Sequence, residues 1–184
     1  MAASKTRAEE IIGPQLQSVH LLRNHVFRVN VGRSRMLIIG LGNPDRGDDT
    51  AGILVARRLR ECGIDAVEHT GATLNLLDLW TASDPVIVID AVMSGAAPGS
   101  IQVWDPSKIR IKNIVFRAST HEFSLADTIE LGRTLNRLPA WMRIYGIEAA
   151  RFETGAQPSP EILSAVERAA EEIQTMIKFI DVSP

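Results

Sequence analysis

The sequence has one cysteine, few aromatic residues and no long apolar run. The single cysteine, Cys62, excludes an internal disulfide, so a reducing compartment, the cytoplasm, is the expected location. Cys62 falls on the apolar stripe of a predicted helix, and we interpret it as a small core residue rather than a nucleophile. Because no run of about 18 apolar residues occurs, we expect no membrane-spanning segment and no membrane partner.

A large excess of charge of either sign is also missing, since the formal net charge is −2. Residues 1–35 hold six basic and two acidic side chains, a net charge of +4, which leaves −6 for residues 36–184. An acidic body argues against nucleic acid as the main partner. We predict a basic flexible arm or N-terminal extension at 1–35, followed by one domain at 36–184.

Apolar runs and helical patterns alternate along residues 36–184. Short apolar runs that end at Gly or Pro predict buried strands, and apolar residues spaced by three and four predict helices. We predict strands at 36–39, 66–69, 86–90, 100–104 and 141–147, and helices at 51–62, 74–80, 123–136 and 160–180. This order predicts a three-layer α/β/α domain, phosphorylase/hydrolase-like, with a mostly parallel twisted sheet of about five strands.

The stretch at residues 36–52, MLIIGLGNPDRGDDTAG, reads as a strand, a glycine turn with carboxylates, and the start of a helix. Asp48 or Asp49 is placed to cap that helix. The glycine spacing, G-x-G-x4-G, differs from the dinucleotide-binding G-x-G-x-x-G, and carboxylates would repel a pyrophosphate. The GLGNP segment is similar to the start of peptidyl-tRNA hydrolases. However, the Thr-Arg-His-Asn run of that family is missing, and no histidine follows until His69.

Three polar residues stand where a ligand site is expected in a parallel sheet. Asp49 follows the first strand, Asp90 ends the central strand, and His121 precedes a helix. Two carboxylates and an imidazole suit a borderline divalent metal such as nickel, zinc or manganese, with positions left open. The alternatives are purely local roles: a helix cap for Asp49, a turn cap for Asp90, and a solvent-facing position for His121.

The chain resembles the hydrogenase maturation proteases, which trim the large subunit of [NiFe] hydrogenases. The resemblance covers about residues 36–181 and depends on an ordered set of short motifs, GLGN with DD and G, TGA, IDA, PG, and STHE with LAD. It implies that Asp49, Asp90 and His121 bind nickel carried by the substrate. It also implies that Asn43, Gly71 and Ala72 contact the substrate, and that no organic cofactor is needed.

The activity implied by the resemblance is that of an endopeptidase, usually classed as aspartic-type. It would remove the C-terminal extension of a [NiFe] hydrogenase large-subunit precursor after nickel insertion. Either the metal activates water or polarises the carbonyl, or Asp48 or Asp49 acts as general base. A different class stays open, a nickel-dependent checkpoint or metallochaperone that binds the large subunit without cutting it.

Overall fold

The computed structural model describes residues 29–31, 34–111 and 123–181. Beyond residue 36 the strands and helices follow the predicted order. The elements are β1 (Val29–Val31), β2 (Ser34–Leu41), η1 (Gly47–Thr50), α2 (Ala51–Glu61), β3 (Val67–His69), η2 (Thr73–Asn75), α3 (Leu76–Leu79), β4 (Pro85–Val92), β5 (Ile101–Trp104), α4 (Leu125–Thr134), β6 (Trp141–Glu148) and α5 (Pro160–Asp181). One predicted site residue, His121, lies outside the described residues.

The strands form one mostly parallel sheet, as predicted. Strands β3, β2, β4 and β6 are parallel neighbours, and β5 pairs antiparallel with β6 at one edge. Parallel strands align their carboxyl ends along one edge of the sheet, which is where ligands bind in such folds. Positions after β2 and late in β4 and β6 therefore meet at that edge.

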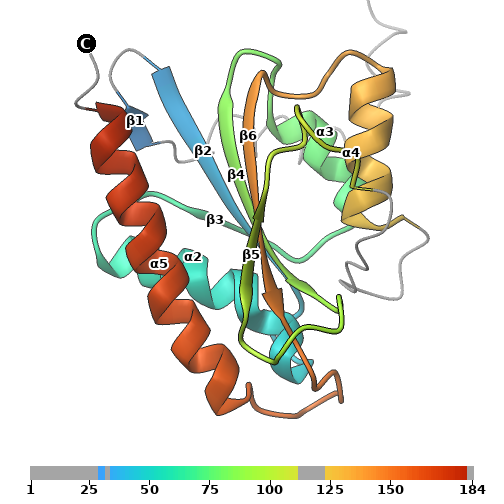
Figure 1. Ribbon diagram of the computed structural model, residues 1–184, viewed down its shortest axis with the longest axis vertical. Coiled ribbons are helices and arrows are strands. Elements are labelled where there is room, and N and C mark those ends of the chain that lie inside the picture. The colour runs from blue at the N-terminus through green and yellow to red at the C-terminus, as the bar shows by residue number, and fades with distance from the viewer. Residues whose placement is uncertain (1–28, 32–33, 112–122, 182–184) are drawn as a thin grey trace, which may run out of the picture.

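Two helices cover each face of the sheet (Figure 1). The apolar residues of β4 alternate between the two faces. Ile87 and Ile89 pack in the core with α2 and α5, whereas Val86 and Val88 pack in the core with α3 and α4. A strand that is buried on both faces needs a continuous apolar run, which explains the composition of β4. Asp90 interrupts this run at a position that shares the α3/α4 face with Val88.

The sheet begins earlier in the chain than the predicted domain boundary. Strand β1 pairs antiparallel with the first residues of β2, with Val29 opposite Met36 and Val31 opposite Ser34. It also contacts α5, and Figure 1 shows it beside the C-terminal end of that helix. The boundary predicted at residue 36 thus cuts through a β-hairpin, because a strand of three residues is too short to show a periodic pattern.

Cys62 is exposed, so its interpretation as a core residue was wrong. Helix α2 ends at Glu61, and Cys62 begins the turn that Gly63 completes with a φ of 77°. The apolar stripe therefore stops at Leu59, which is fully buried.

Candidate functional site

Among the described residues, four carboxylates are buried at the carboxyl edge of the sheet. Asp48 and Asp49 follow β2, Asp90 lies in β4, and Glu148 ends β6; each is at most 4% exposed. A buried carboxylate is costly unless hydrogen bonds, an opposite charge or a cation compensates it. The hydrogen bonds of the four divide them into two pairs with different roles.

Asp48 and Glu148 are fully supplied with donors. The Asp48 carboxylate accepts backbone N–H groups from Ala150, Arg151 and Ser159 at 2.7–3.0 Å. The Glu148 carboxylate accepts the N–H groups of Ser94 and Gly95 and the Ser94 hydroxyl. Such saturation is what a structural carboxylate requires. Sequence reasoning missed Glu148, because its donors are backbone groups of a distant loop.

Asp49 has neither side-chain oxygen in a hydrogen bond within the described part of the chain. It does not cap α2, whose N-cap residue is Thr50, so the capping interpretation of Asp48 or Asp49 was wrong. A guanidinium nitrogen of Arg46 lies 3.8 Å from Asp49 Oδ2. Burial raises the pKa of Asp49 to about 6, and the Arg46 charge opposes that rise.

Asp90 lies inside β4, which continues to Val92, rather than at the end of the strand. Its Oδ1 accepts the N–H of Ala91 at 2.9 Å, and its Oδ2 has no hydrogen-bond partner among the described residues. Burial raises the pKa of Asp90 well above its usual value, and the negative charge of Asp49 raises it further. The two predicted carboxylate ligands are thus brought together, close enough to repel one another.

A close approach of α2 to the sheet puts Asp49 beside Asp90. A Cβ on Gly52 would lie 2.3 Å from the carbonyl oxygen of Ile89 and 2.5 Å from that of Leu41. Only glycine allows the first turn of α2 to rest directly on β2 and β4. The Gly52 of the predicted motif therefore has a packing role, which fixes the distance between the turn and β4.

The turn at residues 70–72 lies at the same edge of the sheet, after β3. His69 Nε2 lies 3.1 Å from the Ala72 carbonyl oxygen, and burial lowers the pKa of this histidine. Thr73 donates its hydroxyl to the Phe123 carbonyl oxygen at 2.7 Å, which joins this turn to the start of α4. Gly71 is exposed. The sequence offered no motif for His69, and the structure gives it a role in holding this turn.

Asn43 lies in the glycine turn itself, with its side-chain Oδ1 accepting the N–H of Asp45 at 2.9 Å. The Asn43 N–H donates to the Asp49 carbonyl oxygen at 3.2 Å, so this residue contacts the backbone that presents the Asp49 carboxylate.

The described residues contain no group of three or more His, Cys, Asp and Glu side chains that could hold a metal ion. They do contain two carboxylates with three oxygens free of hydrogen bonds, from Asp49 and Asp90. Two carboxylates alone are an incomplete shell for a divalent cation, with most positions open to other ligands. This donor set fits a cation that arrives with ligands of its own.

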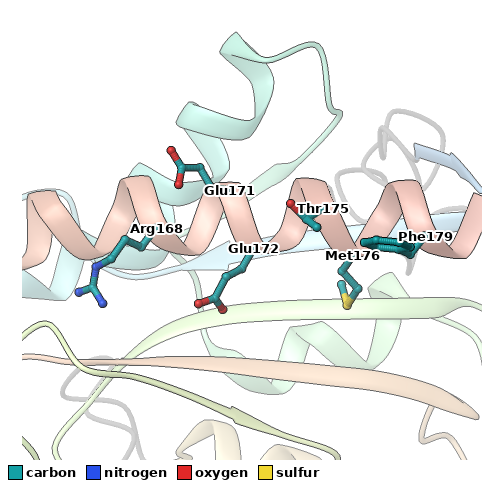
Figure 2. A pocket seen from close by; sticks show the side chains of 6 residues that line it. All are labelled: Arg168, Glu171, Glu172, Thr175, Met176 and Phe179. Carbon is teal, nitrogen blue, oxygen red and sulfur yellow. The ribbon is translucent and has the colours of Figure 1, made fainter.

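A separate pocket of about 490 Å³ lies along α5. Figure 2 shows that its lining side chains come from this helix alone, with Met176 pointing toward the sheet. The lining includes two glutamates, Glu171 and Glu172, but none of the four buried carboxylates. It is therefore distinct from the edge that holds Asp49 and Asp90.

The sequence matches the family model described as hydrogenase maturation protease over residues 62–176, more than half of the chain. FrxA of Pyrococcus furiosus is 27% identical over 134 residues, which are 72% of this chain and 97% of that protein. The crystal structure of the [NiFe] hydrogenase maturation protease HycI from Thermococcus kodakarensis is similar, with 28% identity, a TM-score of 0.59, and coverage of 86% of this chain and 99% of that one.

The hydrogenase maturating endopeptidase HybD from Escherichia coli shares the fold, with 22% identity, a TM-score of 0.60, and coverage of 78% of this chain and 91% of that one. The solved structures share the fold of this chain, and the family model matches more than half of its sequence. The chain therefore belongs to the hydrogenase maturation protease family, and it is a peptidase.

Proposed function

We propose that this peptidase removes the C-terminal extension of a [NiFe] hydrogenase large-subunit precursor after nickel insertion, and that it recognises the nickel carried by that substrate. The observation that carries the proposal is the buried pair Asp49 and Asp90, with three oxygens that accept no hydrogen bond among the described residues. Related structures named as [NiFe] hydrogenase maturation proteases support the choice of substrate.

Nickel would bind between Asp49 and Asp90 as part of the substrate. A divalent cation would offset the repulsion between two buried carboxylates that accept only one hydrogen bond between them among the described residues. His121 is the proposed third ligand, and it precedes by two residues the Phe123 carbonyl that Thr73 contacts. A set of two oxygens and one nitrogen leaves room for the substrate's own ligands, so neither a resident metal nor an organic cofactor is required.

Asp49 is the proposed general base in bond cleavage. Its two oxygens suffice for one bond to the cation and for one proton taken from the attacking water. Asp48, the other carboxylate considered for this role, has its oxygens occupied by three backbone N–H groups. Those bonds favour assigning the base to Asp49.

The substrate backbone would pass the turn that contains Gly71 and Ala72. Gly71 is exposed and has no side chain, so an extended peptide can approach its backbone closely. Asn43 lies in the neighbouring glycine turn, and we propose that its side-chain amide donates to a substrate carbonyl. On this account the precursor is held at two places, by its metal and by its tail.

Three carboxylate-to-amide variants test the assignment with a nickel-loaded precursor as substrate. Asp49→Asn and Asp90→Asn should each lower kcat/KM by at least about 100-fold, because a ligand of the metal is lost. Asp45→Asn is the matched control, since Asp45 is an exposed residue of the same turn. Full cleavage by the Asp49→Asn variant would refute the proposed site.

A further inference from the structure

The Asp48 carboxylate has no part in the proposed metal site or in bond cleavage, yet it is fully buried. Its Oδ2 accepts the N–H groups of Ala150 and Arg151 at 3.0 and 2.9 Å, and its Oδ1 accepts that of Ser159 at 2.7 Å. Burial raises the pKa of Asp48, but these N–H donors outweigh burial and hold it below the usual value. The three donors all belong to residues 149–159, the connection from β6 to α5.

Four more hydrogen bonds join the same two segments, the Asp45–Asp48 turn and the connection at residues 149–159. They are Asp48 N–H to Arg151 O, Gly47 N–H to Ala156 O, Gly155 N–H to Asp45 O, and Arg46 Nε–H to Phe152 O. The turn is thus held along its whole length by a segment about 100 residues later in the sequence. The Asp48 carboxylate accepts three of these seven hydrogen bonds, whereas each other group of the turn takes part in one.

Asp49 depends on this arrangement, because its own side chain has no hydrogen bond that would fix its orientation among the described residues. Its backbone N–H donates to the Arg46 carbonyl oxygen at 3.1 Å within the same turn. Arg46, the nearest cation to the Asp49 carboxylate, is itself held by the Phe152 carbonyl oxygen. Both the backbone of Asp49 and its charged neighbour are therefore positioned by the β6–α5 connection.

We infer that Asp48 is a positioning residue, which anchors the β6–α5 connection against the catalytic turn and so fixes the orientation of the Asp49 carboxylate. The inference rests on the proposed function for the role of Asp49, but the anchoring can be measured without any cleavage. Asp48 acts on the reaction only through its neighbour. Its loss should therefore lower kcat while the affinity for the precursor changes little.

The test compares full-length Asp48→Asn with the wild type and with Asp45→Asn, the control in the same turn. Amide hydrogen exchange by NMR reports on the anchoring. In Asp48→Asn one oxygen becomes an NH₂ group that faces backbone N–H donors, so the amides of Ala150, Arg151 or Ser159 should exchange at least about tenfold faster. The Asp49 amide should exchange faster as well, while amides of β4 and β6 keep their protection.

Steady-state kinetics of precursor cleavage measure how the loss of this anchoring affects the reaction. Asp48→Asn should lower kcat by about 100-fold with KM within about threefold of the wild type, the cost expected for a displacement of about 1 Å. Protected amides at residues 150, 151 and 159 in Asp48→Asn would overturn the inference, as would an unchanged Asp49 amide or an unchanged kcat. If Asp48→Asn does not fold, Asp48→Ser, which keeps one acceptor oxygen, is used instead. Hydrogen exchange of the same amides is then measured.

The two proposals fail in different ways. A wild type that cuts no precursor contradicts the proposed function, and the exchange of the Asp49 amide then decides the positioning inference by itself. A wild type that cuts normally, with an Asp48→Asn variant that cuts equally fast, contradicts the positioning inference alone.

Discussion

At the scale of single residues, hydrogen bonding divides the four buried carboxylates into two pairs. Asp48 and Glu148 each accept several N–H groups, whereas Asp49 and Asp90 together have three side-chain oxygens that accept no hydrogen bond among the described residues. Burying such oxygens costs stability, and proteins tolerate the cost mainly at functional sites. Neighbouring aspartates in one turn, Asp48 and Asp49, thus differ in the hydrogen bonding of their side chains.

This cost predicts that Asp49→Asn stabilises the fold at neutral pH. The pKa of Asp49 rises from 3.8 to about 6 on folding, so the folded state holds this proton more tightly than the unfolded state. Stability therefore falls as the pH rises from about 4 to about 6, by at most about 3 kcal/mol. Asn removes this penalty.

Thermal unfolding across this pH range gives the measurement. The melting temperature of Asp49→Asn should match that of the wild type near pH 4 and exceed it by several degrees at pH 7. A variant that melts at or below the wild-type temperature at pH 7 would contradict the raised pKa.

Gly71→Ala should leave the fold unchanged and weaken binding of the precursor. A Cβ at this position would lie 3.5 Å from its nearest neighbour, His69 Cε1, an ordinary contact. The free energy of unfolding should therefore change by less than about 0.5 kcal/mol. If a substrate backbone passes here, the added methyl group should raise KM about tenfold or more. An unchanged KM would remove Gly71 from the substrate path.

At the scale of elements, the strands and helices that depend on a periodic apolar pattern could be predicted from the sequence. The continuous apolar run of β4 and the Ser159-Pro160 start of α5 appear as predicted, with Ser159 Oγ accepting the Ile162 N–H. What the sequence could not predict depends on contacts between distant segments. The helix predicted at 74–80 begins instead with a 3₁₀ turn at residues 73–75, which leaves the Leu74 side chain 36% exposed and gives the buried position to Leu76.

The same distinction, between local patterns and contacts of distant segments, applies to the residues of the candidate site. Asp49 and Asp90 could be chosen because they follow or interrupt apolar strands, and the structure brings them together. The anchoring role of Asp48 could not be read from the sequence, because its donors are backbone N–H groups about 100 residues away. Assignment of His121 stays a prediction, since the residue lies outside the described part of the chain.

The approach of α2 to the sheet gives an element-scale prediction, Gly52→Ala. The added Cβ would lie 2.3 Å from the Ile89 carbonyl oxygen, so α2 must move away from β4. Overpacking of this kind costs about 1–3 kcal/mol or more, so the melting temperature should fall by at least a few degrees. Gly71→Ala is the control, because the same added Cβ makes only ordinary contacts there. Equal melting temperatures for these two variants would contradict the tight packing.

At the scale of the whole molecule, the domain includes a strand that begins at Val29, and the proposed peptidase site lies at one edge of the sheet. No helix in the described ranges is long and apolar enough to cross a membrane. The pocket along α5 lies apart from the four buried carboxylates. The proposed site at the carboxyl edge of the sheet is therefore separate from that pocket.

The measurement that tests the central claim most directly is intact mass spectrometry of a [NiFe] hydrogenase large-subunit precursor from the same cell. The precursor is incubated with and without this protein, in its nickel-loaded and its nickel-free form. The account predicts loss of a short C-terminal peptide only from the nickel-loaded form. Cleavage of both forms would contradict recognition of the metal. A stable complex whose mass never falls would contradict proteolysis and favour a checkpoint or metallochaperone.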